Sequence, residues 1–152
     1  MSKLRTSDPD QQLIFEFEKL CRYFRAWYIH EGKRHDLSPV QVQILLYLSR
    51  PLPEPRNLTT IANEFFISKA SLSESIKGLM SKQLVTRFSL NGDKRVQYIN
   101  LTRSGKKLAA QLGQIPKILD VSIRTMRPVE KQRLLSGVLK LMSAHENSGG
   151  DA

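Results

Sequence analysis

The chain has 152 residues, of which 40% are hydrophobic and 25% are charged, and these proportions are typical of a folded globular protein. It contains no apolar run long enough to span a bilayer, no apolar N-terminal stretch of the secretory kind, and a single cysteine, Cys21. The composition therefore excludes an intramolecular disulfide framework and predicts a cytoplasmic protein.

The formal net charge is +10 and the sequence pI is about 10.0, which favours a polyanionic partner. The segment from Arg56 to Lys107 carries ten basic and three acidic residues, so most of the excess charge lies in one third of the chain. Charge alone is equally typical of a solvated surface. The motifs within this segment therefore decide between the two interpretations.

The first predicted helix runs from about Pro9 to Ile29, with Asp8 as its N-cap. Its apolar residues recur every three or four positions, at Leu13, Phe17, Leu20, Phe24 and Trp27. So much apolar surface on one helix indicates either ordinary core or a dimer interface. A polar break is expected over residues 30–36.

The second helix begins at a capping box with proline at its first position, Ser38-Pro39-Val40-Gln41, and the apolar stretch 42–48 predicts central core. Prolines at 51, 53 and 55 end it. A third helix is expected from about Thr59, and a fourth from the N-cap Ser68 to about Lys82.

Two strands are predicted over residues 84–88 and 96–101, separated by the turn Asn91-Gly92-Asp93. A fifth helix should begin near Ser104 after the cap Thr102, and Pro116 predicts a kink or a break in it. A sixth helix should begin at Pro128, and residues 146–152 should form a disordered tail. The fold class is therefore mainly α with a small β-hairpin.

Residues 58–79 have the pattern of a helix-turn-helix. Small Ala62 allows two helices to approach, and Leu72, Ile76 and Leu79 share one apolar face. The other face and the start of the fourth helix present small polar and charged residues that suit a DNA major groove, namely Ser68, Lys69, Ala70, Ser71, Ser73, Glu74 and Lys77. An ordinary amphipathic helix pair is the alternative.

The hairpin that follows strengthens the DNA-binding interpretation. Arg87 precedes its turn, and Asp93, Lys94 and Arg95 form the tip and the exit. Two adjacent cations on a turn suit insertion beside phosphates or into a narrow minor groove. Directly after a helix-turn-helix, such a hairpin is typical of a wing.

The sequence resembles the multiple antibiotic resistance regulator (MarR) family of winged-helix repressors over about residues 10–142. The most specific parts are the string 67–73 at the start of the fourth helix, Leu84-Val85 with Arg87, and the wing string 93–105, which fits the pattern Asp-x-Arg followed by Leu-Thr-x-x-Gly. Two positions depart from the family: many members have a cation at Gly78 and a glycine at Gln83.

The resemblance implies a homodimer built from helices in residues 9–36 and 104–145, flanking a DNA-binding lobe over residues 38–103. It implies that Arg95 reaches the minor groove and that Asp93 braces the wing. It also implies an effector pocket between the dimer region and the DNA-binding lobe, which Trp27 and Tyr28 could line. The predicted function is a sequence-specific regulator, in the mode of a repressor, that acts on a pseudo-palindromic operator, is relieved by a small aromatic effector, and is associated with the nucleoid.

Other functions were weighed against this one. No phosphate-cradling loop or nucleophile–base–acid set is present, so an enzyme, a cofactor and a metal site are not predicted. Redox sensing by Cys21 is a weaker hypothesis, because an inert buried cysteine is the more common case. The main alternative is a winged-helix protein-interaction module without DNA readout, which Gly78 and Glu74 favour. RNA binding is disfavoured, since no aromatic stacking platform accompanies the basic residues.

Overall fold

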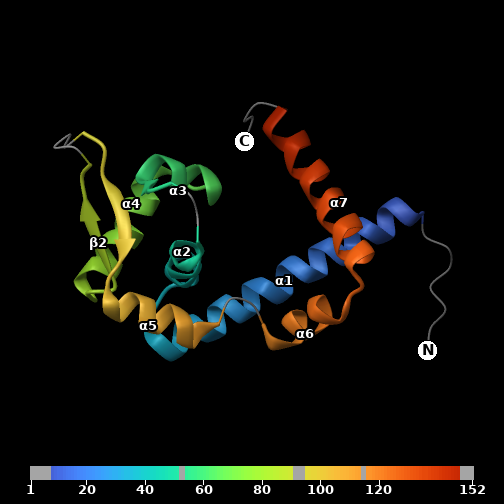
Figure 1. Cartoon of the computed structure of the whole chain (residues 1–152), viewed down its shortest axis with the longest axis horizontal. Coiled ribbons are helices and arrows are strands. Elements are labelled where there is room, and N and C mark those ends of the chain that lie inside the picture. The colour runs from blue at the N-terminus through green and yellow to red at the C-terminus, as the bar shows by residue number, and fades with distance from the viewer. Residues whose placement is uncertain (1–7, 52–53, 91–94, 114–115, 148–152) are drawn as a thin grey trace. The chain divides into compact units, whose positions relative to one another are not determined.

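The computed structural model describes residues 8–51, 54–90, 95–113 and 116–147, and the side chains of all of these except 117–118 and 144–147. The chain divides into two compact units between residues 114 and 115, and each is described by itself. The described residues form helices α1 to α7 and a small antiparallel sheet of three strands (Figure 1). The predicted class, mainly α with a small β-hairpin, is confirmed.

Helix α1 spans Pro9–His35, so the polar break expected over residues 30–36 was wrong. The helix continues because its last turn is basic, which complements the negative end of the helix dipole. Asp36 then adopts a left-handed conformation at φ 53°, and the N–H groups of Asp36 and Leu37 both donate to the Gly32 carbonyl. Polar sequence alone does not end a helix; here the end is fixed by this left-handed residue.

An ion pair of 2.5 Å joins Asp36 at the end of α1 to Lys82 at the end of α4. The Lys82 ammonium, through its hydrogen bond and its charge, lowers the pKa of the Asp36 carboxyl below its ordinary value. The carboxylate is exposed, and exposed ion pairs contribute little to stability. The contact nevertheless shows that residues 46 positions apart meet within the first unit.

Helix α2, Pro39–Ser49, is the centre of the first unit. The predicted capping box is present: the Gln41 N–H donates to Ser38 Oγ over 3.2 Å, and the Ser38 N–H donates to Gln41 Oε1 over 2.9 Å. Val42, Ile44 and Leu45 are completely buried in the hydrophobic core. The helix therefore provides the support on which the neighbouring elements pack.

Helices α3, Leu58–Glu64, and α4, Lys69–Ser81, form the predicted helix-turn-helix. Ser68 caps α4 by accepting from the Ser71 N–H over 3.1 Å. Between the helices, Phe66 lies in the left-handed region at φ 51°, and the Ile67 N–H donates to the Ala62 carbonyl over 3.1 Å. The buried face of α4 consists of Leu72, Ile76 and Leu79. The turn and the apolar face together fix the direction in which α4 is presented.

The sheet has the order β1-β3-β2, formed by Arg56–Asn57, Tyr98–Leu101 and Val85–Phe88. Strands β2 and β3 are the predicted hairpin, with Val85 opposite Leu101. Strand β1 was not predicted, because two residues after a proline-rich stretch carry no periodicity. It forms because Arg56 pairs with Ile99 on the free edge of β3.

Just after the end of α4, Gln83 is a strained residue whose φ is 56°. The Leu84 N–H donates to the Leu79 carbonyl over 2.9 Å and the Gln83 N–H to the Met80 carbonyl over 2.8 Å, which is the Schellman arrangement that usually places glycine at this position. A residue with a Cβ in the left-handed region raises the energy of the folded state.

We therefore expect Gln83→Gly to stabilise the protein by about 0.5–1 kcal/mol, since relief of the strained backbone exceeds the extra entropy of an unfolded glycine. Urea unfolding followed by circular dichroism measures the change. Gln83→Ala is the control, because it removes the same side chain but keeps the Cβ, and it should give no stabilisation. A stabilised alanine variant would show that the side chain, not the backbone, carries the strain.

Helix α5, Arg103–Leu112, completes the first unit and begins at the cap Thr102, as predicted. Thr102 Oγ1 accepts from the Gly105 N–H over 3.0 Å and donates to the Gln83 carbonyl over 2.7 Å, so one side chain joins the start of α5 to the end of α4. The expected break near Pro116 is also present, since α5 ends at Leu112 and the next helix begins at Lys117.

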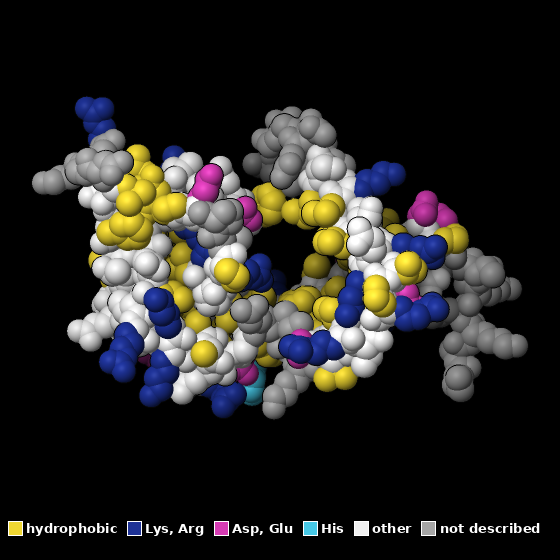
Figure 2. Space-filling model, in the orientation of Figure 1, with side chains coloured by type: hydrophobic (Ala, Val, Ile, Leu, Met, Phe, Trp, Pro, Cys, Tyr) yellow, Lys and Arg dark blue, Asp and Glu magenta, His cyan; other side chains and the backbone are white. Residues whose placement is uncertain are grey.

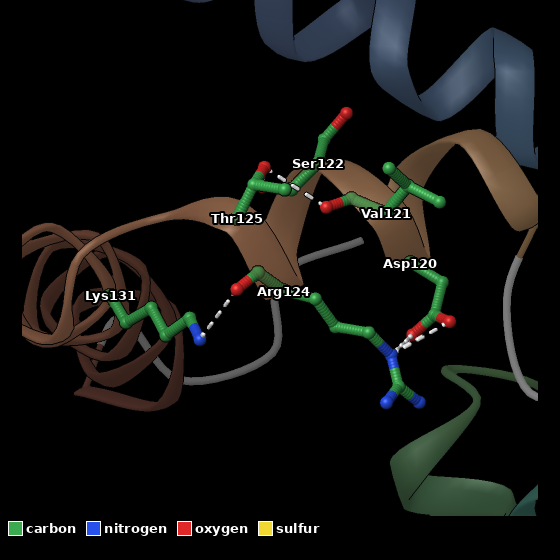
Figure 3. A network of polar contacts seen from close by, with 6 residues as sticks. All are labelled: Asp120, Val121, Ser122, Arg124, Thr125 and Lys131. Carbon is green, nitrogen blue, oxygen red and sulfur yellow. Dashed lines mark hydrogen bonds and ion pairs between the residues drawn. The ribbon is translucent and has the colours of Figure 1, made fainter.

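The second unit contains α6, Lys117–Thr125, and α7, Pro128–Asn147. Figure 3 shows the polar contacts of α6, where Arg124 Nε donates to both carboxylate oxygens of Asp120 over 2.8 and 2.9 Å. The Lys131 ammonium of α7 donates to the Arg124 carbonyl over 3.4 Å. The Lys131 contact joins the start of α7 to the last turn of α6. None of the helices in the described part of the chain combines the length and apolar character that a membrane-spanning helix requires.

Candidate nucleic-acid interface

The outer face of α4 is open to solvent, opposite the buried side chains that attach it to the core. The residues predicted to read DNA are found on it or at its start: Ser68, Lys69, Ala70, Ser71, Glu74 and Lys77 are exposed and Ser73 is half-buried. Their small side chains leave the backbone of the first helical turn accessible. The face therefore has the shape and polarity that a major groove requires.

Two contacts organise the side chains on this face. Ser68 Oγ and Ser71 Oγ lie 2.9 Å apart in a hydrogen bond at the start of the helix. The Lys77 ammonium lies 2.9 Å from Glu74 Oε1, one turn further along. Glu74 thus neutralises Lys77 locally. Because both groups are well exposed, the pair can be exchanged for contacts with a ligand at low cost.

Gly78 lies on the side of α4 that packs against α2, and not on the side that faces solvent. A Cβ at this position would lie 2.5 Å from Gln41 Nε2, and that amide nitrogen donates to the Ser75 carbonyl over 3.3 Å. The glycine is therefore explained by the close approach of α2 to α4. The sequence alone suggested that the absence of a cation at position 78 weakens DNA readout. Helix packing explains this absence instead.

The wing carries cations at its root and at its outer end. Arg87 on β2 is half-buried, and its Nε and Nη2 atoms are buried without a hydrogen-bond partner in the described structure. Arg95, which precedes β3, is exposed. The predicted tip residues Asp93 and Lys94 lie outside the described residues, so the proposed bracing of the wing by Asp93 stays a prediction. Arg87 belongs to the root of the wing, near Ile99, with which it pairs across the strands.

A groove of about 300 Å³ connects the start of α4 with the wing. Lys69 and Arg95 both line it. The remaining lining comes from the end of β1, the beginning of α3 and the segment that precedes β3, at Asn57, Leu58, Thr59, Val96 and Gln97. Two cations from separate elements of the helix-turn-helix and the wing therefore border a single concave surface.

Basic residues extend beyond this groove. Arg103, Lys106 and Lys107 are exposed on α5. Figure 2 shows Lys and Arg side chains gathered over the lower left of the first unit, where Figure 1 places the end of α4 and the start of α5. The first unit thus offers cations over a wide surface, which suits association with a polyanion.

Residues 35–95 match the model of the MarR family. The matched segment includes α2, α3, α4 and β2 and ends at Arg95, so the resemblance seen in the sequence is confirmed for the winged helix. No curated protein sequence matches the chain.

Solved structures of transcriptional regulators share the fold of nearly the whole chain. The transcriptional regulator BldR from Sulfolobus solfataricus is 24% identical, with a TM-score of 0.69, over 93% of this chain and 99% of that one. Staphylococcus aureus MepR in its DNA-binding conformation is 18% identical, with a TM-score of 0.76, over 87% and 97%. The S. aureus MepR–DNA complex is 20% identical, with a TM-score of 0.67, over 86% and 95%. At these identities the likeness shows the fold.

An aromatic cavity of about 320 Å³ adjoins the MarR-type lobe within the first unit. It is lined by Tyr28 of α1, Tyr47 of α2 and Phe65 of α3, together with Gln43, Leu46, Arg50 and Glu64. Burial raises the pKa of both tyrosines, so they are neutral hydrogen-bonding groups at physiological pH. Trp27 is absent from the lining and packs edge-to-face on Tyr28, with 5.1 Å between ring centroids.

Cys21 is an exposed free thiol on α1. Of the cations near it in the sequence, Lys19 is paired with Glu16 over 2.9 Å and Arg22 with Glu18 over 3.4 Å. These carboxylates offset the positive charge that would activate a thiol, and redox sensing stays a prediction. Among the described residues, no three His, Cys, Asp or Glu side chains are placed to hold a metal ion.

Proposed function

We propose that the protein is a homodimeric transcription regulator that binds a pseudo-palindromic site in double-stranded DNA and acts as a repressor. In this proposal α4 enters the major groove, and the wing places Arg95 in the adjoining minor groove. The single observation that carries the proposal is the groove bordered by both Lys69 and Arg95, because it joins the two elements that must contact DNA together.

The proposed dimer is supported by apolar surface on helices at both ends of the chain. In the first unit, α1 exposes Leu13, Ile14, Phe15, Leu20, Tyr23 and Ile29. In the second, α7 exposes Leu134, Leu135, Val138, Leu139, Leu141 and Met142, and hydrophobic side chains are visible along it in Figure 2. Apolar surface of this extent marks an interaction site. A second copy of the chain is the partner that a two-fold symmetric operator requires.

Fluorescence anisotropy with random duplex DNA at low and at high salt tests the proposal. We expect binding at low salt that weakens steeply as salt rises, because bound lysines and arginines release counterions from the DNA. Selection of bound fragments from genomic DNA should then yield a pseudo-palindrome with half-sites about one helical turn apart. Absence of binding at low salt would contradict the proposal and favour a winged-helix module that binds proteins.

Arg95→Ala should weaken operator binding by about tenfold and reduce the slope of log affinity against log salt by about 1, because a cation in the minor groove displaces counterions from the flanking phosphates. Anisotropy titrations at several salt concentrations measure both quantities. Lys140→Ala on α7 removes the same charge from an exposed position in the second unit, so it should leave both unchanged. Equal behaviour of the two variants would contradict a DNA contact at Arg95.

Relief of repression by a small aromatic effector belongs to the same proposal. The aromatic cavity with Tyr28 and Tyr47 supports it, since neutral phenol groups and rings are suited to an aromatic ligand.

The interaction-module alternative now rests on Glu74 alone, because Gly78 is explained by helix packing. No enzymatic role is proposed.

A further inference from the structure

Helix α5 carries a patch of cations that no carboxylate neutralises in the described structure. Its members, Arg103, Lys106 and Lys107, are exposed and lie within about 6 Å of one another along the helix axis. The sequence of α5 contains no acidic residue. Seven cations elsewhere in the described structure are paired with carboxylates, and none of these pairs includes a member of the α5 patch. The patch is therefore a local concentration of positive charge.

The cations of the α5 patch do not serve the stability of their helix. Arg103 is the first residue of α5, where the positive end of the helix dipole disfavours a cation. Helices α1, α6 and α7 instead carry an acidic residue in their first turn. Arg103 also lies three and four positions before Lys106 and Lys107, a spacing at which like charges repel. Because this arrangement opposes folding, it indicates a role in binding an anionic partner.

The α5 patch lies away from the surface proposed to read DNA. The groove lined by Lys69 and Arg95 adjoins the first residue of α4. The start of α5 is joined to the other end of α4, because Thr102 Oγ1 donates to the Gln83 carbonyl over 2.7 Å. Helix α4 has 13 residues, so its two ends are about 20 Å apart. The two cationic surfaces therefore belong to opposite ends of α4, and Figure 1 shows α5 beyond the end of the sheet.

The surroundings of the patch favour a nucleic acid over a folded protein or a membrane. The other exposed residues of α5 are Ser104, Ala110 and Gln111, whereas protein interfaces depend on aromatic and large apolar anchors and are poor in lysine. Ala109 and Leu112 are buried in the core, so α5 has no apolar face to insert into a membrane. A DNA strand carries one phosphate per about 3.4 Å of helix axis, which is close to the spacing of these cations.

We propose that the α5 patch binds the phosphate backbone of a second DNA duplex, so that the protein bridges two segments of DNA. This inference rests on the proposed function, in which α4 and the wing hold the first duplex. The contacts join ammonium and guanidinium groups to phosphate oxygens. They contain no base contact, so the second duplex is bound without regard to its sequence.

A bridging assay with the full chain tests the proposal. A biotinylated random duplex on beads is saturated with protein at low salt, unbound protein is removed, and a fluorescent random duplex is added. We expect the fluorescent duplex to be retained in proportion to the bound protein. Bound protein that retains no second duplex would overturn the bridging alone. Absence of bound protein would overturn the proposed function as well, so the two failures are distinguishable.

The double variant Lys106→Gln and Lys107→Gln locates the site. We expect it to remain on the beads within about twofold of the wild type and to retain about tenfold less of the second duplex, because each lost phosphate contact weakens binding. Its urea midpoint should not fall, since cations near the start of a helix do not stabilise it. The matched control, Lys33→Gln with Lys140→Gln, removes two exposed charges elsewhere and should retain the second duplex normally.

Three results would overturn the assignment of the patch. Equal retention of the second duplex by the α5 variant and the control would place the bridging contact elsewhere. Loss of the α5 variant itself from the beads would show that the patch contacts the first duplex. Tighter binding of phosphatidylglycerol vesicles or of poly-glutamate than of duplex DNA, lost in the α5 variant, would show that the partner is a membrane or an acidic protein.

Discussion

Replacement of Gly105 by alanine should destabilise the protein by about 3 kcal/mol, because it forces backbone atoms of two elements apart. Gly105 is buried in the first turn of α5, where a Cβ would lie 1.9 Å from the Leu84 carbonyl oxygen and 3.2 Å from Leu101 Cδ2. The Leu84 carbonyl cannot move away freely, since it accepts from the Thr102 N–H over 3.1 Å. The added methyl therefore disturbs the junction of β2, β3 and α5 as a whole.

Urea unfolding of Gly105→Ala should show a lower midpoint, with the slope of the transition unchanged if the denatured state is unaffected. Two other glycines provide matched controls. A Cβ at Gly137 of α7 has nothing within 4 Å, so Gly137→Ala should stabilise by about 0.5–1 kcal/mol through helix propensity. A Cβ at Gly78 meets the end of the Gln41 side chain and no backbone atom, so Gly78→Ala should destabilise less than Gly105→Ala. A loss below about 1 kcal/mol in Gly105→Ala would show that the junction can relax.

Local signals in the sequence predicted most of the elements correctly. The caps Ser38, Ser68 and Thr102 each accept the backbone hydrogen bond that their position implies. A cap works through residues two or three positions away, and an amphipathic face through residues three or four positions away, so both are visible in a short stretch of chain. The resemblance to a known family supported the prediction of the wing, because the signature residues of the wing lie in one continuous stretch of the sequence.

Contacts between distant residues were not predictable in this way. Strand β1 depends on the free edge of β3, and Gly78 depends on the Gln41 side chain 37 positions earlier. In the sequence Arg56 is only one of ten basic residues, whereas in the fold it is buried beside a cavity. Charge counts describe a surface and contain no information on which cation the fold will bury.

The exposure of the residues predicted to read DNA was predictable as a group because α4 has one buried and one open face. Their individual states were not: the sequence did not show that Glu74 holds Lys77 or that Arg87 is half-buried at the root of the wing. Each of these states depends on side-chain conformation and on neighbours from other elements. The exposed face of α4 is thus well defined, while its role in reading DNA stays a prediction.

The double substitution Leu135→Glu and Leu139→Glu should convert the proposed dimer into a monomer. Both leucines are more than half exposed on α7, at 55% and 58%, so the substitutions introduce no charge into the core of the single chain. Two glutamates on each protomer would be brought together with their copies at an apolar interface, where unpaired charges are very costly. Sedimentation velocity measures the association state directly.

The same variant should lose operator affinity by about 100-fold, because a monomer gives up the high effective concentration with which a second recognition helix binds its half-site. Ser136→Glu is the matched control: it introduces the same charge on α7, but successive helical residues are 100° apart, which places it away from the centre of the apolar face. It should remain dimeric and bind DNA normally. A double variant that still sediments as a dimer would place the interface elsewhere. One that is monomeric but retains full affinity would show that a single winged helix is sufficient to bind the operator.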